Sequence, residues 1–193
     1  MSSHRVLGII PARGGSKRIP NKNLRLLAGS PLISYTIRAA QAATKLTDYV
    51  VATDSQEIAN VAKSYGAPVL MRPAVPDDQT SGEAIAWVLD HTDLYYGMIV
   101  LLHPTSPIRD PKHIDQAIEM LAASNAPSLA SVECKKRTYT HNASIYAIRR
   151  EAFNGEHYSE QSIPFLMDKR HSLDVNDELD LKLAELMLNA GNY

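Results

Sequence analysis

The stretch that decides the fold is VLGIIPARGGSKRIPNKN, which runs from Val6 to Asn23. Its first five residues are apolar and predict a buried first strand. The loop that follows has two adjacent glycines and, continued by two residues, five basic side chains: Arg13, Lys17, Arg18, Lys22 and Arg25. Adjacent glycines let a backbone approach a ligand closely, and cationic side chains match the oxygens of a polyphosphate. The pattern therefore predicts a phosphate-binding loop after strand 5–10.

This loop differs from the two common nucleotide-binding patterns. A P-loop has G-x-x-x-x-G-K-[ST], whereas here the glycines are adjacent and no helix begins after Lys17. The pattern G-x-G-x-x-G is also absent from the loop. An exposed loop with solvated charges is the alternative. The net charge of the chain is only −1, so such a cluster of bases favours the phosphate interpretation.

The composition is typical of a soluble globular protein and predicts one domain, residues 1–193, with 45% hydrophobic and 21% charged residues. The single cysteine, Cys134, cannot form an internal disulfide, which fits a reducing compartment. No signal peptide pattern is present, and no apolar run approaches the ~20 residues of a membrane helix. We expect a cytoplasmic protein without membrane contact. Its basic residues form no stripe, so we expect no nucleic acid partner.

Short apolar runs alternate with longer helical patterns, which is typical of an α/β fold with a largely parallel sheet. Strands are expected at 5–10, 48–53, 68–71, 97–102, 128–133 and 143–148, and helices at 31–43, 55–65, 81–94, 111–124 and 177–190. The expected architecture is three-layered and Rossmann-like, with helices on both faces of the sheet. Segment 149–172 has the weakest pattern, so we interpret it as irregular.

Local signals mark several helix ends. Asp54 is interpreted as a cap of the second helix, and Gly66 as its end. Asp110 before Pro111 predicts a capped start, and Asp177 opens the last helix. Trp87 falls on the apolar pattern of its helix and is expected in the core.

Four chemically suggestive segments follow expected strands, namely 11–23, 53–54, 72–81 and 103–109. In an open α/β sheet, ligands bind beyond the carboxyl ends of the strands. One shared site is therefore expected.

The string PARGGSKRIPNKN (11–23) closely resembles the nucleotide-binding loop of the cytidylyltransferases that make CMP-activated acidic sugars, the acylneuraminate (CMP-sialic acid) synthetase family. LLHPTSPIR (101–109) is close to that family's LLQPTSPLR, and NASIY (142–146) resembles its NGAIY. LDVN (173–176) resembles its D-x-D before the final helix. The resemblance covers nearly the whole chain and implies a nucleotide-diphospho-sugar transferase-like fold.

The resemblance also implies a reaction and a set of roles. CMP would pass from CTP to a 2-keto sugar acid, a sialic acid-like nonulosonate, with release of pyrophosphate. Arg13, Lys17 and Lys22 would bind the triphosphate, with Arg13, Lys17 and Asp174 as the catalytic set. Asp174 and Asn176 would hold Mg²⁺. The other expected nucleotide- or sugar-binding residues are Ala12, Gly14, Gly15, Ser16, Asn23 (at the cytosine), Arg72 and Ser81 (near base and ribose), His103, and Asn142 and Tyr146 (at the sugar acid).

Three departures from the family pattern bear on function. His103 stands where the family has Gln, and Asn176 stands where it has a second Asp. Segment 133–141 is shorter than in many relatives, where it helps to form the dimer and the sugar pocket. We therefore expect altered sugar recognition and at most a weak homodimer. The alternatives are a degenerate nucleotide-binding module with little turnover, and a sugar nucleotidyltransferase for another sugar or nucleotide.

Several residues also have plain structural interpretations. Asn23 would serve equally as a turn residue, and Asp174 as an acidic residue near a helix start. Thr105, Ser106 and Arg109 would stabilise a turn as readily as a ligand. His103 would pack at a strand end, bind a sugar or act as a base. Cys134 has no catalytic partner pattern and is interpreted as incidental.

Overall fold

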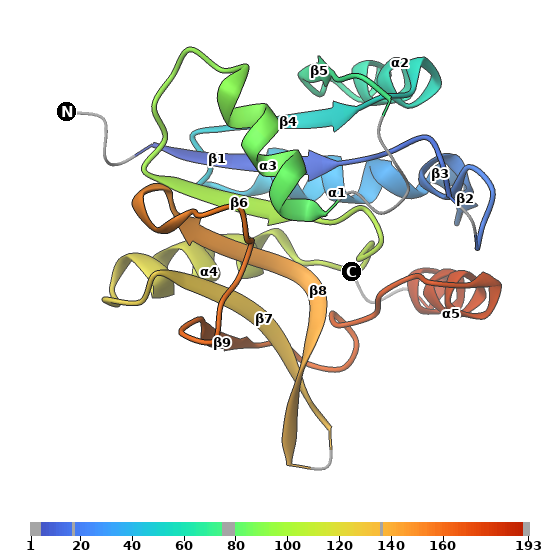
Figure 1. Ribbon diagram of the computed structural model, residues 1–193. Coiled ribbons are helices and arrows are strands. Elements are labelled where there is room, and N and C mark those ends of the chain that lie inside the picture. The colour runs from blue at the N-terminus through green and yellow to red at the C-terminus, as the bar shows by residue number, and fades with distance from the viewer. Residues whose placement is uncertain (1–4, 17, 75–79, 136, 191–193) are drawn as a thin grey trace.

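A seven-stranded sheet forms the centre of the molecule (Figure 1). The computed structural model describes residues 5–16, 18–74, 80–135 and 137–190. The strands, in the order in which they lie side by side, are β5 (Val69–Met71), β4 (Asp48–Thr53), β1 (Val6–Pro11), β6 (Met98–Leu102), β8 (Thr138–Arg149), β7 (Ser128–Lys135) and β9 (Ile163–Leu166). Only β8 is antiparallel to its neighbours, β6 and β7. The predicted α/β fold with a mostly parallel sheet is confirmed.

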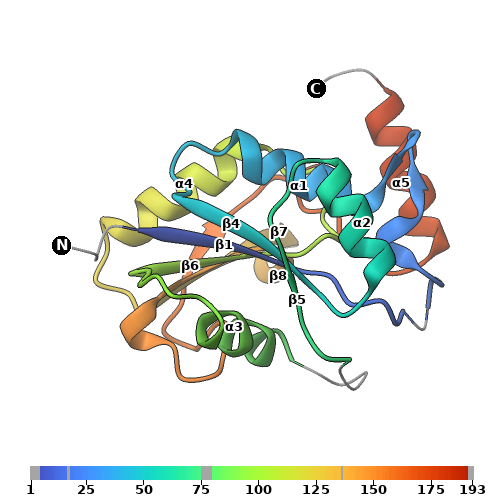
Figure 2. The same ribbon diagram turned by 90° about the horizontal axis from the view of Figure 1, so that it is seen from above.

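Helices cover both faces of the sheet, as Figure 2 shows from above. On one face lie α1 (Leu32–Ala42), α2 (Gln56–Ser64) and α4 (Pro111–Ala122), and on the other lies α3 (Ser81–Asp90). The last helix, α5 (Glu178–Asn189), lies beyond the sheet beside a small hairpin of β2 (Leu26–Leu27) and β3 (Ser30–Pro31). Among the described helices, none is long and apolar enough to span a bilayer.

Alternation along the central strands produces two separate apolar cores. Ile10 and Val100 point toward the α1–α2–α4 side, whereas Ile9 and Ile99 point toward α3, because successive strand side chains face opposite ways. A third cluster joins the first loop to the C-terminal helix. It includes Ile19, Val175 and Leu181, and it ties the basic loop to the segment that precedes α5.

Most of the predicted helix ends are confirmed. The Asp110 carboxylate accepts from the Lys112 amide before the proline of α4, and Asp177 forms a capping box at α5. Gly66 follows α2 with φ +76°, a left-handed conformation that suits glycine. The predicted cap at Asp54 is wrong. Ser55 caps α2, because its side chain accepts from the Ile58 amide while the Asp54 carboxylate turns to the first loop.

Three expectations about the later chain need correction. Segment 149–172 is not wholly irregular, since β9 lies within it and pairs in parallel with β7. The strand expected at 143–148 begins at Thr138, so residues 133–135 and 138–141 pair as the ends of β7 and β8 in an arm that extends from the body (Figure 1). Helix α3 ends at Asp90, short of the expected 94. Trp87 packs against the core only in part, with its ring stacked on His91.

Candidate active site

Two adjoining cavities lie where the loops after β1 and β6 meet. The first, of about 310 Å³, is lined by Pro11, Arg13, Ser16, Arg18, Ile19, Lys22, Asn23, His103, Pro104 and Thr105. The second, of about 240 Å³, is lined by Pro11, Arg13, Arg72, Thr80, Ser81, Ala84 and His103. Arg13 and His103 line both cavities. The predicted meeting of the strand-end segments is thus present in the structure.

Gly14 holds the loop against the start of α2. Its amide donates to the Asp54 carboxylate at 2.7 Å, and a Cβ at this position would lie 3.0 Å from the Ser55 Cβ. The close approach to Ser55 explains the glycine at position 14. The Gly14 N–H already has a hydrogen-bond partner within the protein, the Asp54 carboxylate. Gly15 is exposed beside it, and the preceding Ala12 is fully buried.

Two bases of the loop reach the segment before α5. Lys22 donates from Nζ to the carbonyl of Val175 at 2.9 Å, and Arg18 donates to the Asn176 side-chain oxygen at 3.2 Å. Burial lowers the pKa of Lys22, an effect that the nearby Asp174 carboxylate opposes and Arg18 and Arg13 reinforce. Two segments that are far apart in the sequence, 18–22 and 175–176, are therefore brought together beside the first cavity.

Arg25 does not share this location. Its guanidinium makes two hydrogen bonds, of 2.6 and 3.0 Å, to the Glu178 carboxylate of α5, and both side chains are about half exposed. It therefore belongs to a surface ion pair and not to the cluster of cavity-lining bases. Lys17 lies outside the described residues.

Asn23 and Arg72 are buried polar residues that line different cavities. The Asn23 amide nitrogen donates to the Arg13 carbonyl at 3.0 Å, so Asn23 shapes the loop as well as lining the first cavity. Arg72 lines the second cavity, and burial lowers its pKa against the attraction of Asp54. Both keep the places at the cavities that the sequence predicted, and their contacts with base and ribose stay predictions.

His103 links the two cavities to strand β8. Its Nδ1 lies 3.0 Å from the Ala143 carbonyl, which can only accept, so Nδ1 carries the proton and Nε2 accepts from the Ser81 hydroxyl at 3.0 Å. Burial, and then His157, lower the pKa of His103 to about 4. The ring is neutral at pH 7, and its one basic nitrogen is hydrogen-bonded to Ser81.

Arg109 is a buried structural residue. It donates to the carbonyls of His103 and Ser144 and to the hydroxyls of Thr36 and Ser144. Burial lowers its pKa to about 9. Of the two interpretations that the sequence left open for Arg109, the structure supports the one that stabilises the turn. Thr105 also has a structural contact, since its carbonyl accepts from the Val175 amide at 2.7 Å.

Asp174 and Asn176 lie next to each other near the basic loop. The Asn176 amide nitrogen donates to Asp174 Oδ2 at 2.8 Å and also lies 3.3 Å from the Asp174 carbonyl. The other carboxylate oxygen, Oδ1, is buried and has no hydrogen-bond partner among the described residues. The charge of Asp174 also raises the pKa values of four groups of the site, namely Lys22, His103, Arg109 and Tyr146. The carboxylate therefore lies close to all four of them.

Asn142 lies in a buried network instead of on an open surface. Its oxygen accepts from the Ser131 hydroxyl and the Ser144 amide, and its nitrogen donates to the Ser172 hydroxyl at 2.9 Å. This leaves little capacity for a ligand. Tyr146 is only 4% exposed, and burial raises its pKa to about 12. Their predicted contact with a sugar acid stays a prediction.

A cluster of rings near His103 was missed by the sequence analysis. Tyr146 lies 4.7 Å from the His157 ring and 5.6 Å from the Tyr158 ring, and His141 lies 4.6 Å from Tyr158, between ring centroids. The adjacent His157 and Tyr158 were a usable signal, but they fall in the weakly patterned segment 149–172.

A comparison with known families identifies the chain. The family model described as Cytidylyltransferase matches residues 7–187, which is most of its length. The chain belongs to the cytidylyltransferase family. This confirms the resemblance inferred from the loop 11–23, and with it the enzyme class.

Relatives of this cytidylyltransferase differ in length. It is 34% identical to the N-acylneuraminate cytidylyltransferase of Escherichia coli, over 93% of this chain but 51% of that protein. It is 32% identical to the CMP-N,N'-diacetyllegionaminic acid synthase of Legionella pneumophila, over 95% of this chain and 96% of that protein. The second alignment spans 223 positions, more than the 193 residues of this chain, so that relative has residues that this chain lacks.

Solved structures support the fold. A CMP:2-keto-3-deoxy-manno-octonic acid synthetase, in a complex with CTP, aligns with a TM-score of 0.80 at 18% identity, over 96% of this chain and 99% of that one. The 4-diphosphocytidyl-2C-methyl-D-erythritol synthase of Anaerococcus prevotii aligns with a TM-score of 0.74 at 10% identity, over 97% of each chain. At these identities the similarity concerns the fold alone.

Proposed function

We propose that this cytidylyltransferase transfers CMP from CTP to a 2-keto sugar acid of the nonulosonate type, with Mg²⁺ held at Asp174. The observation that carries the proposal is the convergence of the basic loop, the turn after β6 and the Asp174 segment around one cavity. The names of two relatives, an N-acylneuraminate cytidylyltransferase and a CMP-diacetyllegionaminic acid synthase, support the choice of acceptor.

The nucleotide would occupy both cavities, since Arg13 lines each of them. Arg13 and Lys22 would bind phosphate oxygens, and a charge-assisted hydrogen bond of this kind contributes about 1.5–3 kcal/mol. Ser81 and Arg72, in the second cavity, would lie toward the nucleoside. His103 would separate the nucleotide from the aromatic cluster, because it lines both cavities and also contacts Tyr146.

The reaction needs the anomeric hydroxyl of the sugar acid to attack the α-phosphorus of CTP. A new P–O bond forms, the bond from the α-phosphorus to the bridging oxygen breaks, and pyrophosphate leaves with that oxygen. The proton of the attacking hydroxyl is released to water or to the departing pyrophosphate. Arg13 and Lys22 would stabilise the negative charge that collects on the departing pyrophosphate. They do so best when water is excluded, and the partial burial of Lys22 favours this.

Asp174 fits the proposed magnesium. Its Oδ1 is a buried carboxylate oxygen with no partner among the described residues, and such hard oxygens are the ligands that Mg²⁺ prefers. Bound there, the cation would neutralise phosphate charge and help to orient the triphosphate. Asn176 fits less well as it stands, because its oxygen accepts from Arg18 and its nitrogen faces Asp174.

This arrangement of Asn176 favours one alternative, a nucleotide-binding module with little turnover. The amide takes one oxygen of Asp174 by hydrogen bonding and brings no negative charge of its own. The experiment that separates the two functions is pyrophosphate release, measured with each of the four nucleoside triphosphates against a panel of 2-keto sugar acids. Release that requires CTP and a nonulosonate supports the proposal. Binding of CTP without release from any sugar acid supports the module.

The Asn176→Asp variant sharpens this test. It replaces an amide–carboxylate hydrogen bond by two adjacent carboxylates, so the metal-free protein should lose stability and Mg²⁺ should restore it. Turnover should rise, or saturate at lower Mg²⁺. Thermal melts with and without Mg²⁺ follow the first effect, and pyrophosphate release follows the second. Asp177→Asn is the matched control, because Asp177 caps α5. Equal Mg²⁺ dependence in both variants and the wild type would contradict a metal at this position.

A further inference from the structure

Two histidines and an aspartate gather on the face of the sheet that carries α4, apart from the two active-site cavities. His113 lies in the first turn of α4, and Asp168 and His171 lie in the loop after β9. Each of the three offers one donor atom, and these atoms all lie within 4.8 Å of one another. None of the three residues lines the active-site cavities.

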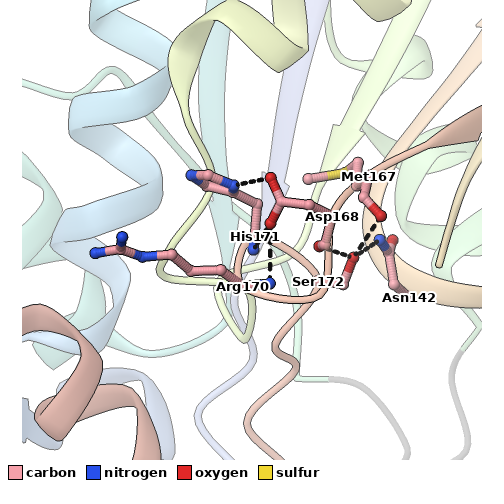
Figure 3. A network of polar contacts seen from close by, with 6 residues as sticks. All are labelled: Asn142, Met167, Asp168, Arg170, His171 and Ser172. Atoms are coloured by element: carbon pink, nitrogen blue, oxygen red, sulfur yellow. Dashed lines mark hydrogen bonds and ion pairs between the residues drawn. The ribbon is translucent and has the colours of Figure 1, made fainter. Parts of the chain in front are cut away.

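The loop holds Asp168 and His171 in a fixed arrangement (Figure 3). Asp168 Oδ1 accepts from the amides of Arg170 and His171, at 2.9 and 3.0 Å. Its Oδ2 lies 2.7 Å from Nδ1 of His171. The carboxylate and the imidazole are therefore already oriented, which lowers the entropy that a ligand would have to overcome to order them.

His113 completes the group from a separate element. Its ring centroid lies 4.8 Å from that of His171, with the rings at 76°. Its Nδ1 is buried and has no hydrogen-bond partner among the described residues, although buried polar atoms are normally satisfied. His113 therefore presents a buried ring nitrogen without a partner toward the pair that His171 and Asp168 form.

We propose that His113, Asp168 and His171 bind one divalent transition-metal ion of the zinc type. Two imidazoles and one carboxylate are a donor set that suits such ions, whereas Mg²⁺ prefers oxygen ligands alone. Bonds of about 2.0–2.2 Å place tetrahedral ligands about 3.4 Å apart, so the donor atoms need only small side-chain rotations from their present spacing. The side chains of His171 and Asp168 are 23% and 60% exposed, which leaves a path for the ion and a position for water.

The metal would act on the active site through the loop. Ser172, next to His171, donates to the Asp168 carbonyl at 2.7 Å and accepts from Asn142 at 2.9 Å. Two residues further on lies Asp174. An ion bound by residues from α4 and from this loop would fix the path of the chain into Asp174. The site would thus be structural, and it would limit the motion of the proposed magnesium ligand.

The test is a titration of the nucleotide-free protein with Co²⁺, a spectroscopic substitute for Zn²⁺, in excess Mg²⁺ to occupy oxygen-only sites. We expect one equivalent to bind with visible d–d absorption, and Zn²⁺ to displace it. His113→Ala and His171→Ala should each weaken binding at least about 10- to 100-fold, since even residues beyond the direct ligands have effects of that size. His91→Ala is the matched control, because His91 is exposed at the end of α3 and should leave binding unchanged.

Circular dichroism of each variant establishes that it is folded, and His113→Gln replaces His113→Ala if the latter is not. A second measurement is the thermal melt, in which Zn²⁺ should raise the midpoint of the wild type and His91→Ala but not of the His113 and His171 variants. Absence of Co²⁺ binding in the wild type would overturn the proposal. So would binding that survives both ligand substitutions, because the ion would then sit elsewhere.

Discussion

Polar side chains have different surroundings in the basic loop 11–23 and around β8, where the sugar acid, the proposed acceptor, is expected to bind. In the loop, Arg13 and Lys22 line a cavity, and Lys22 donates to a single carbonyl, that of Val175. Around β8, Asn142 and Arg109 are buried and spend most of their hydrogen-bonding capacity on neighbouring protein atoms. A polar residue in a segment that resembles the family can thus either line the ligand site or stabilise the fold. Which of the two it does depends on the groups that surround it in the folded protein.

This contrast changes where a sugar acid should make contact. The predicted acceptor residue Asn142 holds Ser131 and Ser172 together, so it supports the shape of the site from within. The Tyr158 ring stacks on Tyr146, and the His157 ring meets Tyr146 edge-on. His157 also lies beside His103, which lines both cavities. We expect specificity for the sugar to depend on these rings as much as on Asn142.

The largest effect is expected for Arg109→Met, which tests whether the buried arginine on the acceptor side is structural. It removes the Arg109 donors of the Ser144 carbonyl and hydroxyl, and one of the donors of the His103 carbonyl, which also accepts from Thr36. Each buried acceptor that is left without a donor costs about 1–3 kcal/mol, and Arg109 serves more than one acceptor. Urea unfolding measures the loss. Arg25→Met is the control, because its exposed pair with Glu178 should contribute less than about 1 kcal/mol. Equal losses in the two variants would break the comparison.

His103→Gln tests the residue that connects the two regions, through the pH dependence of the free energy of unfolding. The pKa of His103 is about 4 in the folded protein against 6.5 for a free histidine, so the unfolded state binds the extra proton between these values. Stability is therefore fully present above pH 6.5 and is lost as the pH falls toward 4, by up to about 3 kcal/mol. The glutamine variant should lack this part of the pH dependence. Unfolding at pH 4.5 and 7.5 measures it, with His91→Gln as the exposed control, and parallel curves for wild type and His103→Gln would contradict it.

Arg13→Ala tests the other side of the comparison, a guanidinium that lines both cavities of the proposed nucleotide site. Loss of one charge-assisted contact of about 1.5–3 kcal/mol should weaken CTP binding roughly 10- to 100-fold and leave cytidine binding much less affected. Isothermal titration calorimetry measures both. Arg38→Ala is the control, since its guanidinium lies over the Tyr35 and Tyr65 rings of another surface. Normal CTP affinity in Arg13→Ala would mean that the loop does not bind phosphate.

The smallest effect is expected for Ala143→Gly. Ala143 has φ +56° at the position where the family pattern has glycine, and an alanine in this conformation carries strain of about 1 kcal/mol. Glycine should raise the melting temperature by roughly 2–4 °C for a chain of this size. In Ala147→Gly, within the regular part of β8, the same replacement should lower it. A fall in both variants would show that Ala143 is not strained.

Much of the fold could be predicted because its signals are local. Apolar runs marked β1, β4, β6 and β7, and the residues at Asp110, Gly66 and Asp177 marked helix ends within one turn. The strand β9 was missed because it has only four residues, one of them proline. Of its three other residues, which are all apolar, Ile163 and Phe165 pack against the core and Leu166 is exposed. Its pairing partner, β7, is distant in the sequence. The cap at Ser55 was misassigned to Asp54, because two adjacent residues offered the same short-range chemistry and a contact with Gly14 decided between them.

By itself, the sequence determined the α/β class, the basic loop and the family, since each rests on residues that are neighbours along the chain. Only the tertiary structure decided what the single side chains do. Arg18 meets Asn176 across 158 residues, Arg25 pairs with Glu178 instead of facing the cavity, and His113 joins His171 from another element. The physical reason is that periodicity and capping act over a few residues. Burial, pairing and pKa depend on which distant segments the packed sheet brings into contact.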